Sequence, residues 1–216
     1  MLISPLIHDR KVGGVLRLDS QEPNSFTTDD LRILDAIATL ASSAVSNAIL
    51  YHRTEELAIR DSLTGLYVQR YFRERLAEEH RRSYLLEAPL TLLMCDLDHF
   101  KDLNDRYGHG VGDMVLIQSA QILSKYAESG IVVRYGGEEF ALLIPKIDLK
   151  EGQRLAEKIR TAFEAIRLTV RRELLEVTIS IGVASIPEDT RDQEELIHIA
   201  DTRLYEAKRK GRNRVC

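Results

Sequence analysis

The sequence has only two cysteines, shows no strong excess of charge of either sign, and contains no long hydrophobic run. Cys95 lies inside an apolar segment and Cys216 ends the chain, a placement unlike that of a disulfide pair. Because disulfides are rare in reducing compartments, we expect a cytoplasmic protein. A catalytic thiol has no support from the surrounding residues.

The other absences narrow the function classes. A net charge of -4 argues against a general nucleic-acid binder. No stretch of about eighteen consecutive apolar residues occurs, so the sequence predicts no membrane span. Residues 1–5 lack the charged start and long apolar core of a signal peptide. With 216 residues, 44% of them hydrophobic and 30% charged, the composition fits one globular domain and part of another.

The first sixty residues predict two strands and one long helix. Residues 2–7 and 12–19 read as strands joined by a polar turn. Residues 27–30 supply helix-capping side chains and first-turn acids for a helix that we expect to run to about Arg60. Apolar residues follow this helix in two adjacent stripes: Leu34, Ala38, Ala41, Val45 and Ala48 in one, and Ile33, Ile37, Leu40 and Ala44 in the other.

A double stripe can serve two surfaces. One stripe would cover the strands, and the other could pair with the same helix of a second copy of the chain. The helix could equally pack on its own domain alone, because the seam turns polar at His52 and Glu55. The sequence leaves both alternatives open.

Residues 61–216 alternate between predicted strands and predicted helices. The expected strands are 90–97, 131–133, 141–144 and 177–183, and the expected helices start near Tyr71 or span 112–127, 155–166 and 196–207. The pattern predicts an α+β fold with a mostly antiparallel central sheet flanked by helices.

The segment Arg134-Tyr135-Gly136-Gly137-Glu138-Glu139-Phe140 joins two of these strands. Its glycine pair predicts a hairpin turn, because glycine accepts positive φ without a Cβ clash. The flanking runs are apolar at consecutive positions, which is typical of strands covered on both faces, so we expect the hairpin in the middle of the sheet. Burying two carboxylates at such a place costs free energy unless a cation or a hydrogen-bonding ligand offsets that cost.

Asp96 follows the apolar run of the strand 90–97. If this strand lies beside the hairpin, Asp96 can face Glu138 and Glu139 and form an oxygen-ligand site suited to Mg²⁺ or Mn²⁺. We expect Asp96 and Asp98 to lie on opposite faces of the strand, so that they do not share one ion. Asp102 reads as a solvated residue.

Groups that favour phosphate lie on either side of this candidate site. The amides of residues 99–101 begin a predicted helix, where N–H groups and the helix dipole attract anions. Lysine and arginine residues near the C-terminus could clamp the same phosphates.

These motifs together resemble the GGDEF domain, the catalytic unit of diguanylate cyclases, over residues 61–215. Five separated blocks carry the resemblance: Asp61-x-Leu63-Thr64-Gly65-Leu66, Asp96-x-Asp98-x-Phe100-Lys101-x-x-Asn104-Asp105, Gly108-His109-x-x-Gly112-Asp113, Arg134 to Phe140, and Ala207-Lys208-x-x-Gly211-Arg212-Asn213.

The first sixty residues resemble the closing part of a GAF domain. The likeness rests on Pro5-Leu6, Gly13-Gly14-Val15-Leu16, the segment 26–31 and Asn47-Ala48. The front half of such a domain is missing, so we expect no functioning sensor pocket. The sequence would then divide into partial GAF strands at 1–26, a linker helix at 27–60 and a GGDEF domain at 61–216.

The GGDEF resemblance implies a sheet like that of the polymerase palm and an activity that joins two GTP molecules into cyclic di-GMP with release of pyrophosphate. It implies two-metal catalysis across a homodimer, without nucleic acid or a membrane span. The implied catalytic residues are Asp96, Glu138 and Glu139. The implied metal ligands, for Mg²⁺ or Mn²⁺, are Asp96, the Leu97 carbonyl, Glu138 and Glu139. The implied substrate-binding residues are His99, Phe100, Lys101, Asn104, Asp113, Gly136, Gly137, Lys208 and Arg212.

Two departures from the family pattern stand out. The Arg-x-x-Asp motif of product inhibition is replaced by Ala127-Glu128-Ser129-Gly130, so we predict that inhibition through this site is lost. Val68 stands where the family usually has an asparagine. We expect this change to weaken a structural detail and to leave the metal site unchanged. The alternative functions are a non-catalytic module that binds GTP or cyclic di-GMP, and an interaction module built on the long helix.

Overall fold

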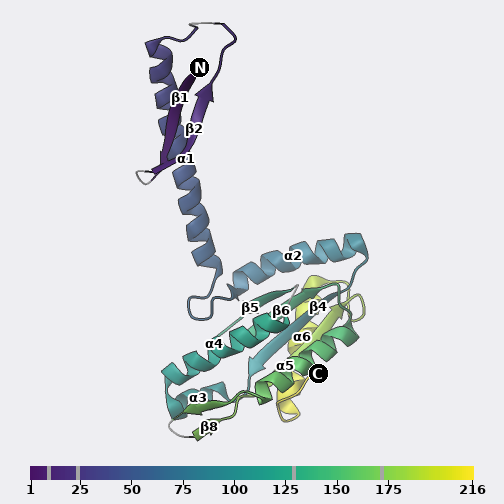
Figure 1. Ribbon diagram of the computed structural model, residues 1–216. Helices are drawn as coiled ribbons and strands as arrows, with labels where there is room; N and C mark the ends of the chain where they lie inside the picture. Colours follow the sequence, from purple (N-terminus) through teal and green to yellow (C-terminus); the bar gives the residue numbers. More distant parts are fainter. Residues whose placement is uncertain (9–10, 23–24, 128–129, 171–172) are drawn as a thin grey trace. The chain divides into compact units, whose positions relative to one another are not determined.

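The computed structural model describes residues 1–8, 11–22, 25–127, 130–170 and 173–216, with the side chains of residues 8 and 50–58 left out. The chain divides into two compact units, Met1–Ala58 and Ile59–Cys216 (Figure 1).

The first unit is a β-hairpin packed on a helix. Strands β1 (Leu2–His8) and β2 (Lys11–Leu18) pair antiparallel, and helix α1 (Thr28–Ile59) follows. Thr27 caps this helix, because its hydroxyl accepts from the amide of Asp30 at 3.3 Å while the Asp30 carboxylate accepts from the amide of Thr27 at 2.7 Å. Both strands and the helix were predicted within about a residue at each end.

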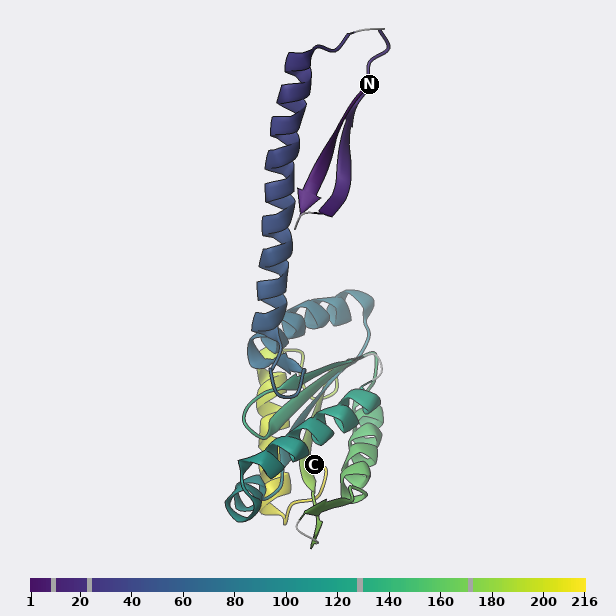
Figure 2. The ribbon, with the colours of Figure 1, turned by 60° about the vertical axis from the view of Figure 1, so that its left-hand side comes forward.

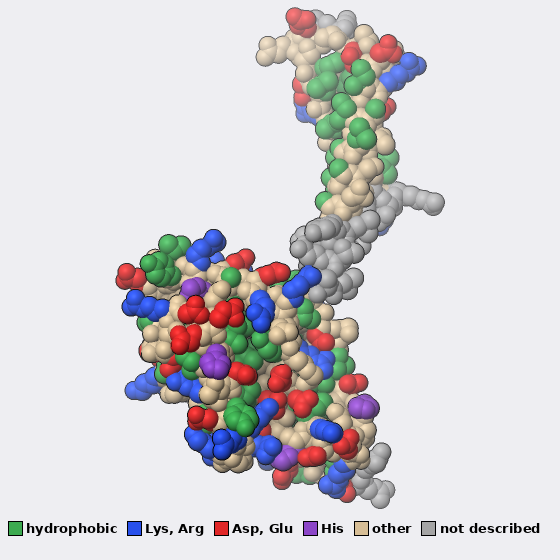
Figure 3. Space-filling model, turned by 180° about the vertical axis from the view of Figure 1, so that it is seen from behind, with side chains coloured by type: hydrophobic (Ala, Val, Ile, Leu, Met, Phe, Trp, Pro, Cys, Tyr) green, Lys and Arg blue, Asp and Glu red, His purple; other side chains and the backbone are tan. Residues whose placement is uncertain are grey.

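The two stripes of α1 have different surroundings. In the first stripe, Leu34 and Ala38 are buried, whereas Val45 and Ala48 further along the helix are exposed. Ile33, Ile37 and Leu40 of the second stripe are 59%, 49% and 71% exposed. Figure 3 shows hydrophobic side chains gathered on the surface of this unit. The predicted polar end of the seam, at His52 and Glu55, lies outside the described side chains.

The second unit is built on a five-stranded sheet in the order β3-β5-β6-β4-β9. Its strands are β3 (Tyr67–Val68), β5 (Ile131–Arg134), β6 (Glu139–Pro145), β4 (Leu90–Leu97) and β9 (Ile179–Ile186). Only the β3–β5 pair within this sheet is parallel, which confirms the predicted mostly antiparallel α+β fold. A small hairpin of β7 (Leu168–Val170) and β8 (Glu173–Leu175) stands apart.

Helices cover both faces of this sheet (Figures 1 and 2). The helices are α2 (Gln69–Leu86), α3 (Phe100–Tyr107), α4 (His109–Tyr126), α5 (Leu149–Glu164) and α6 (Gln193–Arg209). Leu93 and Cys95 of β4 pack in one core with residues of α4 and α5. Leu92 and Met94 pack in a second core with residues of α2 and α6. Because successive side chains of β4 enter opposite cores, the strand is apolar at consecutive positions.

Val68 stands at the N-cap position of α2 and makes no side-chain capping hydrogen bond. An asparagine there could accept from a free helix amide, so the departure at this position removes a possible cap. Among the described residues, we find no helix whose length and hydropathy would let it span a membrane.

Candidate active site

The pairing of β4 with β6 brings the carboxylate of Asp96 to the turn that contains Gly136 and Gly137. Asp96 lies opposite Glu139 in the register of the two strands. The amide of Leu97 donates to the carbonyl of Glu138 at 3.3 Å, which continues the pairing into the turn. The predicted meeting of Asp96 with the two glutamates therefore follows from strand register.

The two glycines of the turn do not have the backbone conformation that we predicted. Neither Gly136 nor Gly137 has positive φ, so the reason given for their place in the turn was wrong. A Cβ atom on Gly136 would lie 2.6 Å from Oε2 of Glu139, whereas a Cβ on Gly137 would meet no atom within 4 Å. Gly136 thus leaves room for the carboxylate of Glu139.

An arginine holds the turn from the other side. Arg134 donates to both carboxylate oxygens of Asp61 at 3.0 Å and to the carbonyl of Gly137 at 3.1 Å and 2.8 Å. Burial opposes ionisation of Asp61, yet hydrogen bonds from Thr64 and Arg134 hold the pKa of its carboxyl below the ordinary value. Both residues belong to the quoted motifs, but no local pattern predicts that residues 73 positions apart form this contact.

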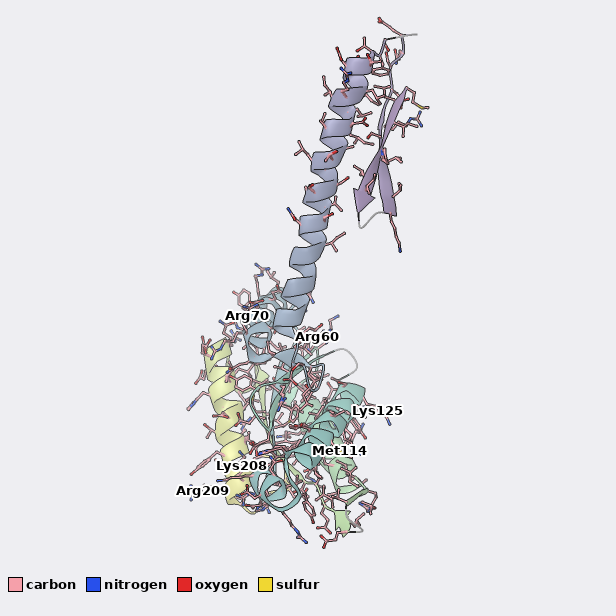
Figure 4. All side chains as sticks on the ribbon, turned by 90° about the vertical axis from the view of Figure 1, so that its left-hand side faces the viewer. Arg60, Arg70, Met114, Lys125, Lys208 and Arg209 are labelled. Carbon is pink, nitrogen blue, oxygen red and sulfur yellow. The ribbon has the colours of Figure 1, made fainter. Side chains whose placement is uncertain are left out.

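The charges around Asp96 come from three segments of the chain. Lys208 lies near the C-terminal end of α6 (Figure 4). Its Nζ is 2.7 Å from Oδ2 of Asp96. Burial raises the pKa of Asp96, and the Lys208 ammonium opposes that rise. Burial also raises the pKa of Glu138, and repulsion from Asp96 adds to it. The structure therefore brings Asp96, Glu138 and Lys208 together.

Asp98 corrects one expectation. The prediction that Asp96 and Asp98 lie on opposite faces started from a wrong premise, because residues two apart in a strand share a face, and Asp98 itself lies just after the end of β4. Ser180 pairs with Asp96 in the β4–β9 register, and its hydroxyl donates to Asp98 at 2.7 Å. Asp98 is only 9% exposed.

The start of α3 carries the predicted anion-binding amides. His99 occupies its N-cap with φ 57°, and the helix begins at Phe100. Lys101 is exposed, and Nδ1 of His99 lies 3.1 Å from the exposed carboxylate of Asp102. Asp102 is therefore a solvated residue, as expected.

The packing of α3 on α4 shapes a second part of the site. Oδ1 of Asn104 is buried and has no hydrogen-bond partner among the residues that the structure describes. A Cβ on Gly112 would lie 1.9 Å from this atom, so the carboxamide rests directly on the glycine. Asp113 follows Gly112 and is exposed. A buried acceptor that no described residue satisfies is suited to a ligand with N–H donors.

Within the described ranges, no three His, Cys, Asp or Glu side chains are arranged to hold a metal ion. The proposed ligand set of Asp96, Leu97, Glu138 and Glu139 remains a prediction. Two adjacent carboxylates can still supply part of a site whose other ligands come from a phosphate-bearing substrate.

Comparison with known families gives two matches. The family described as "Diguanylate cyclase, GGDEF domain" matches residues 58–214, and the GAF domain matches residues 1–47.

Curated relatives resemble the chain over most of its length. Diguanylate cyclase A of Treponema denticola is 34% identical over 212 residues, which cover 96% of this chain and 56% of that protein. Response regulator PleD of Caulobacter vibrioides is 40% identical over 163 residues, which cover 74% of this chain and 36% of that protein. The chain thus spans only between about a third and just over half of these relatives.

A solved structure is also similar to this chain. The coiled coil and GGDEF domain of DgcB from Caulobacter crescentus, in complex with c-di-GMP, aligns with a TM-score of 0.74 at 29% identity. The alignment covers 83% of this chain and 97% of that one.

Proposed function

The chain belongs to the GGDEF family of diguanylate cyclases, and on that premise we propose that it condenses two GTP molecules into cyclic di-GMP with release of pyrophosphate. The observation that carries the proposal is the β4–β6 register, which sets Asp96 against the Gly-Gly-Glu-Glu turn with Lys208 2.7 Å away. The names of relatives such as Diguanylate cyclase A support the same reaction.

The carboxylates of Asp96 and Glu138 suit Mg²⁺ or Mn²⁺. Burial raises the pKa of both carboxyls, and repulsion from Asp96 raises that of Glu138 further, so a cation between them would stabilise the charged pair. The Leu97 carbonyl and Glu139 complete the proposed ligand set, and Glu139 could also assist proton removal. A bound metal ion would activate the 3′-hydroxyl and stabilise the leaving pyrophosphate.

Asn104 and Asp113 are proposed to recognise the guanine edge. Guanine presents N–H donors that a carboxylate and an amide oxygen can accept. The buried, unpartnered Oδ1 of Asn104 supports this assignment, because such an atom costs free energy unless a ligand satisfies it.

The phosphates would lie between the start of α3 and the end of α6. We assign the amides of His99, Phe100 and Lys101 to one side and the cations of Lys208 and Arg212 to the other. Gly136 and Gly137 would let the backbone approach the nucleotide closely.

Catalysis would require a homodimer, because each site holds one GTP. The exposed stripe of α1, with Ile33, Ile37 and Leu40, supports pairing of this helix with a second copy. Such a stalk would raise the effective concentration of one half-site near the other. We propose residues 1–26 as GAF strands, 27–60 as the linker helix and 61–216 as the catalytic domain, in a cytoplasmic protein.

Product inhibition through the usual Arg-x-x-Asp positions is proposed to be absent. Ala127 and Gly130 replace the two charged residues, while Glu128 and Ser129 lie outside the described residues. A Cβ on Gly130 would lie 2.3 Å from Cδ1 of Ile144, which supports the view that an aspartate does not fit there.

The reaction is tested by incubating the protein with GTP and Mg²⁺ and measuring cyclic di-GMP by mass spectrometry. We expect product from the wild type and none from Glu138→Ala. Product from that variant would overturn the metal role of Glu138. GTP binding without product from a dimeric wild type would instead favour the non-catalytic module, so the oligomer mass is measured in parallel.

A further inference from the structure

The carboxylate of Asp98 is fully engaged without contacting the proposed substrate groups. It lies just after β4 and accepts the hydroxyls of Thr178 at 2.8 Å and Ser180 at 2.7 Å. A third donor is the backbone amide of Asn213, 2.9 Å from Oδ2. Thr178 comes just before β9 and Ser180 lies within it, whereas Asn213 belongs to the loop after α6. Asp98 therefore ties that loop to the sheet.

The loop has an unusual backbone. Gly211, Arg212 and Asn213 have φ values of 114°, 63° and 47°. Residues with a Cβ rarely adopt this region, so Arg212 and Asn213 need surrounding contacts to hold them there. The amide of Arg212 donates to the carbonyl of Ala207 at 3.0 Å, which leaves Asn213 to be fixed by other groups.

Asn213 is fixed at both its backbone and its side chain. Its amide is held by Asp98, and its carboxamide contacts Glu164 at 2.6 Å and Arg160 at 3.1 Å. The chain then continues beside β9, where Val215 forms a parallel bridge with Ile181. The turn is thus anchored on each side of Arg212.

This turn determines where Arg212 is presented. Arg212 comes three residues after the end of α6, and Lys208 near that end places its Nζ 2.7 Å from Oδ2 of Asp96. The turn that carries Arg212 therefore starts at the edge of the candidate site.

We propose that Asp98 is a positioning residue, which holds the amide of Asn213 and thereby fixes the left-handed turn that presents Arg212 to the nucleotide phosphates. The inference rests on the proposed function, which assigns Arg212 to those phosphates. A carboxylate suits this task because both its oxygens only accept, and three donors converge on it. An asparagine would turn an NH₂ group toward one of those donors.

The test compares the affinities of GTP and GMP, measured by calorimetry with Mg²⁺ present. GTP carries the terminal phosphates and GMP lacks them, so their ratio reports on the phosphate contacts. We expect Asp98→Asn to weaken GTP binding about tenfold while GMP binding is unchanged, since contacts to charged groups contribute about this much. Arg212→Ala should do the same, and the double variant should lose little more.

Thr178→Val is the matched control, because it removes another donor to the same carboxylate oxygen and keeps the Asn213 contact. It should retain the preference for GTP. Equal weakening of GTP and GMP by Asp98→Asn, or the same loss in Thr178→Val, would reduce Asp98 to a general structural role and overturn the proposal.

A second variant covers the case in which Asp98→Asn does not fold. Gly211 is exposed and has φ 114°, so Gly211→Ala strains the same turn without disturbing the core. We expect it to lower the preference for GTP, and an unchanged preference would contradict the proposal. If the wild type binds GTP and Asp98→Asn keeps the full preference for GTP over GMP, only the positioning role is refuted. A wild type that does not bind GTP refutes the proposed function as well.

Discussion

The guanidinium of Arg134 lies 3.0 Å from both carboxylate oxygens of Asp61, and the same side chain donates to the carbonyl of Gly137. Asp61 lies two residues after the end of α1, and Gly137 belongs to the turn that carries Glu138. The ion pair therefore holds the proposed catalytic turn against the start of the catalytic unit. Both partners are mostly shielded, with side chains 17% and 21% exposed.

This pair predicts a pH dependence of stability. The folded-state pKa of Asp61 lies below its unfolded value of about 3.9. The stabilisation is therefore present above pH ~4 and is lost as the pH falls through the lower folded pKa. We expect Asp61→Asn to unfold more easily at pH 7 by about 1–3 kcal/mol. Because the chain has no tryptophan, urea unfolding is followed by circular dichroism.

The comparison of wild type with variant isolates this pair from the other carboxylates. The difference in unfolding free energy should shrink as the pH is lowered below about 4. A difference that stays constant down to pH 3 would show that protonation of Asp61 does not govern the contact.

The contact of Gly112 with Asn104 predicts that replacing this glycine weakens recognition of the guanine base. A Cβ there would lie 1.9 Å from Oδ1 of Asn104 and 3.2 Å from Cζ of Phe100, so Gly112→Ala must displace the carboxamide. We expect the KM for GTP to rise about tenfold, consistent with loss of one or two hydrogen bonds to the base. Initial rates of cyclic di-GMP formation measure it.

Gly110→Ala is the matched control, because it lies on the same helix and a Cβ there meets no atom within 4 Å. Its KM should be unchanged. Equal KM values for the two variants would show that Asn104 takes no part in binding GTP.

Product inhibition gives a third expectation. Initial rates should not fall when cyclic di-GMP is added, because the charged pair of the usual inhibitory motif is missing at Ala127 and Gly130. Gly130→Asp should also destabilise the fold, since its Cβ would lie 2.3 Å from Ile144 Cδ1 and 2.8 Å from the carbonyl oxygen of Leu143. If cyclic di-GMP binds tightly and inhibits in a way that depends on residues 127–130, the predicted absence of product inhibition is wrong.

The sequence predicted those features that depend on local pattern. The apolar run before Asp96 indicated a strand covered on both faces, and β4 is buried at every position. The glycine pair indicated the hairpin, and its strands occupy the interior of the sheet. Features that depend on distant contacts could not be read in this way. The pairing of Arg134 with Asp61 and the anchoring of Asn213 by Asp98 join residues 73 and 115 positions apart.

The role of the glycine pair could not be predicted either, because it depends on a side chain three residues away. Positive φ is a local property and was the natural expectation for glycine in a turn. The steric need at Gly136 arises only when the Glu139 carboxylate folds back beside it.

The two glycines therefore form an internal comparison. Gly136→Ala would place a Cβ 2.6 Å from Oε2 of Glu139 and push this carboxylate away, whereas Gly137→Ala meets open space. We expect Gly136→Ala to lower kcat by about tenfold or more, because small displacements in a catalytic constellation are costly. Gly137→Ala should reduce activity less, and only if the nucleotide approaches the backbone at that point. Both kcat values are measured from cyclic di-GMP formation at saturating GTP. If Gly137→Ala were the more damaging change, the close approach of substrate to the backbone, and not the placement of Glu139, would explain the glycine pair.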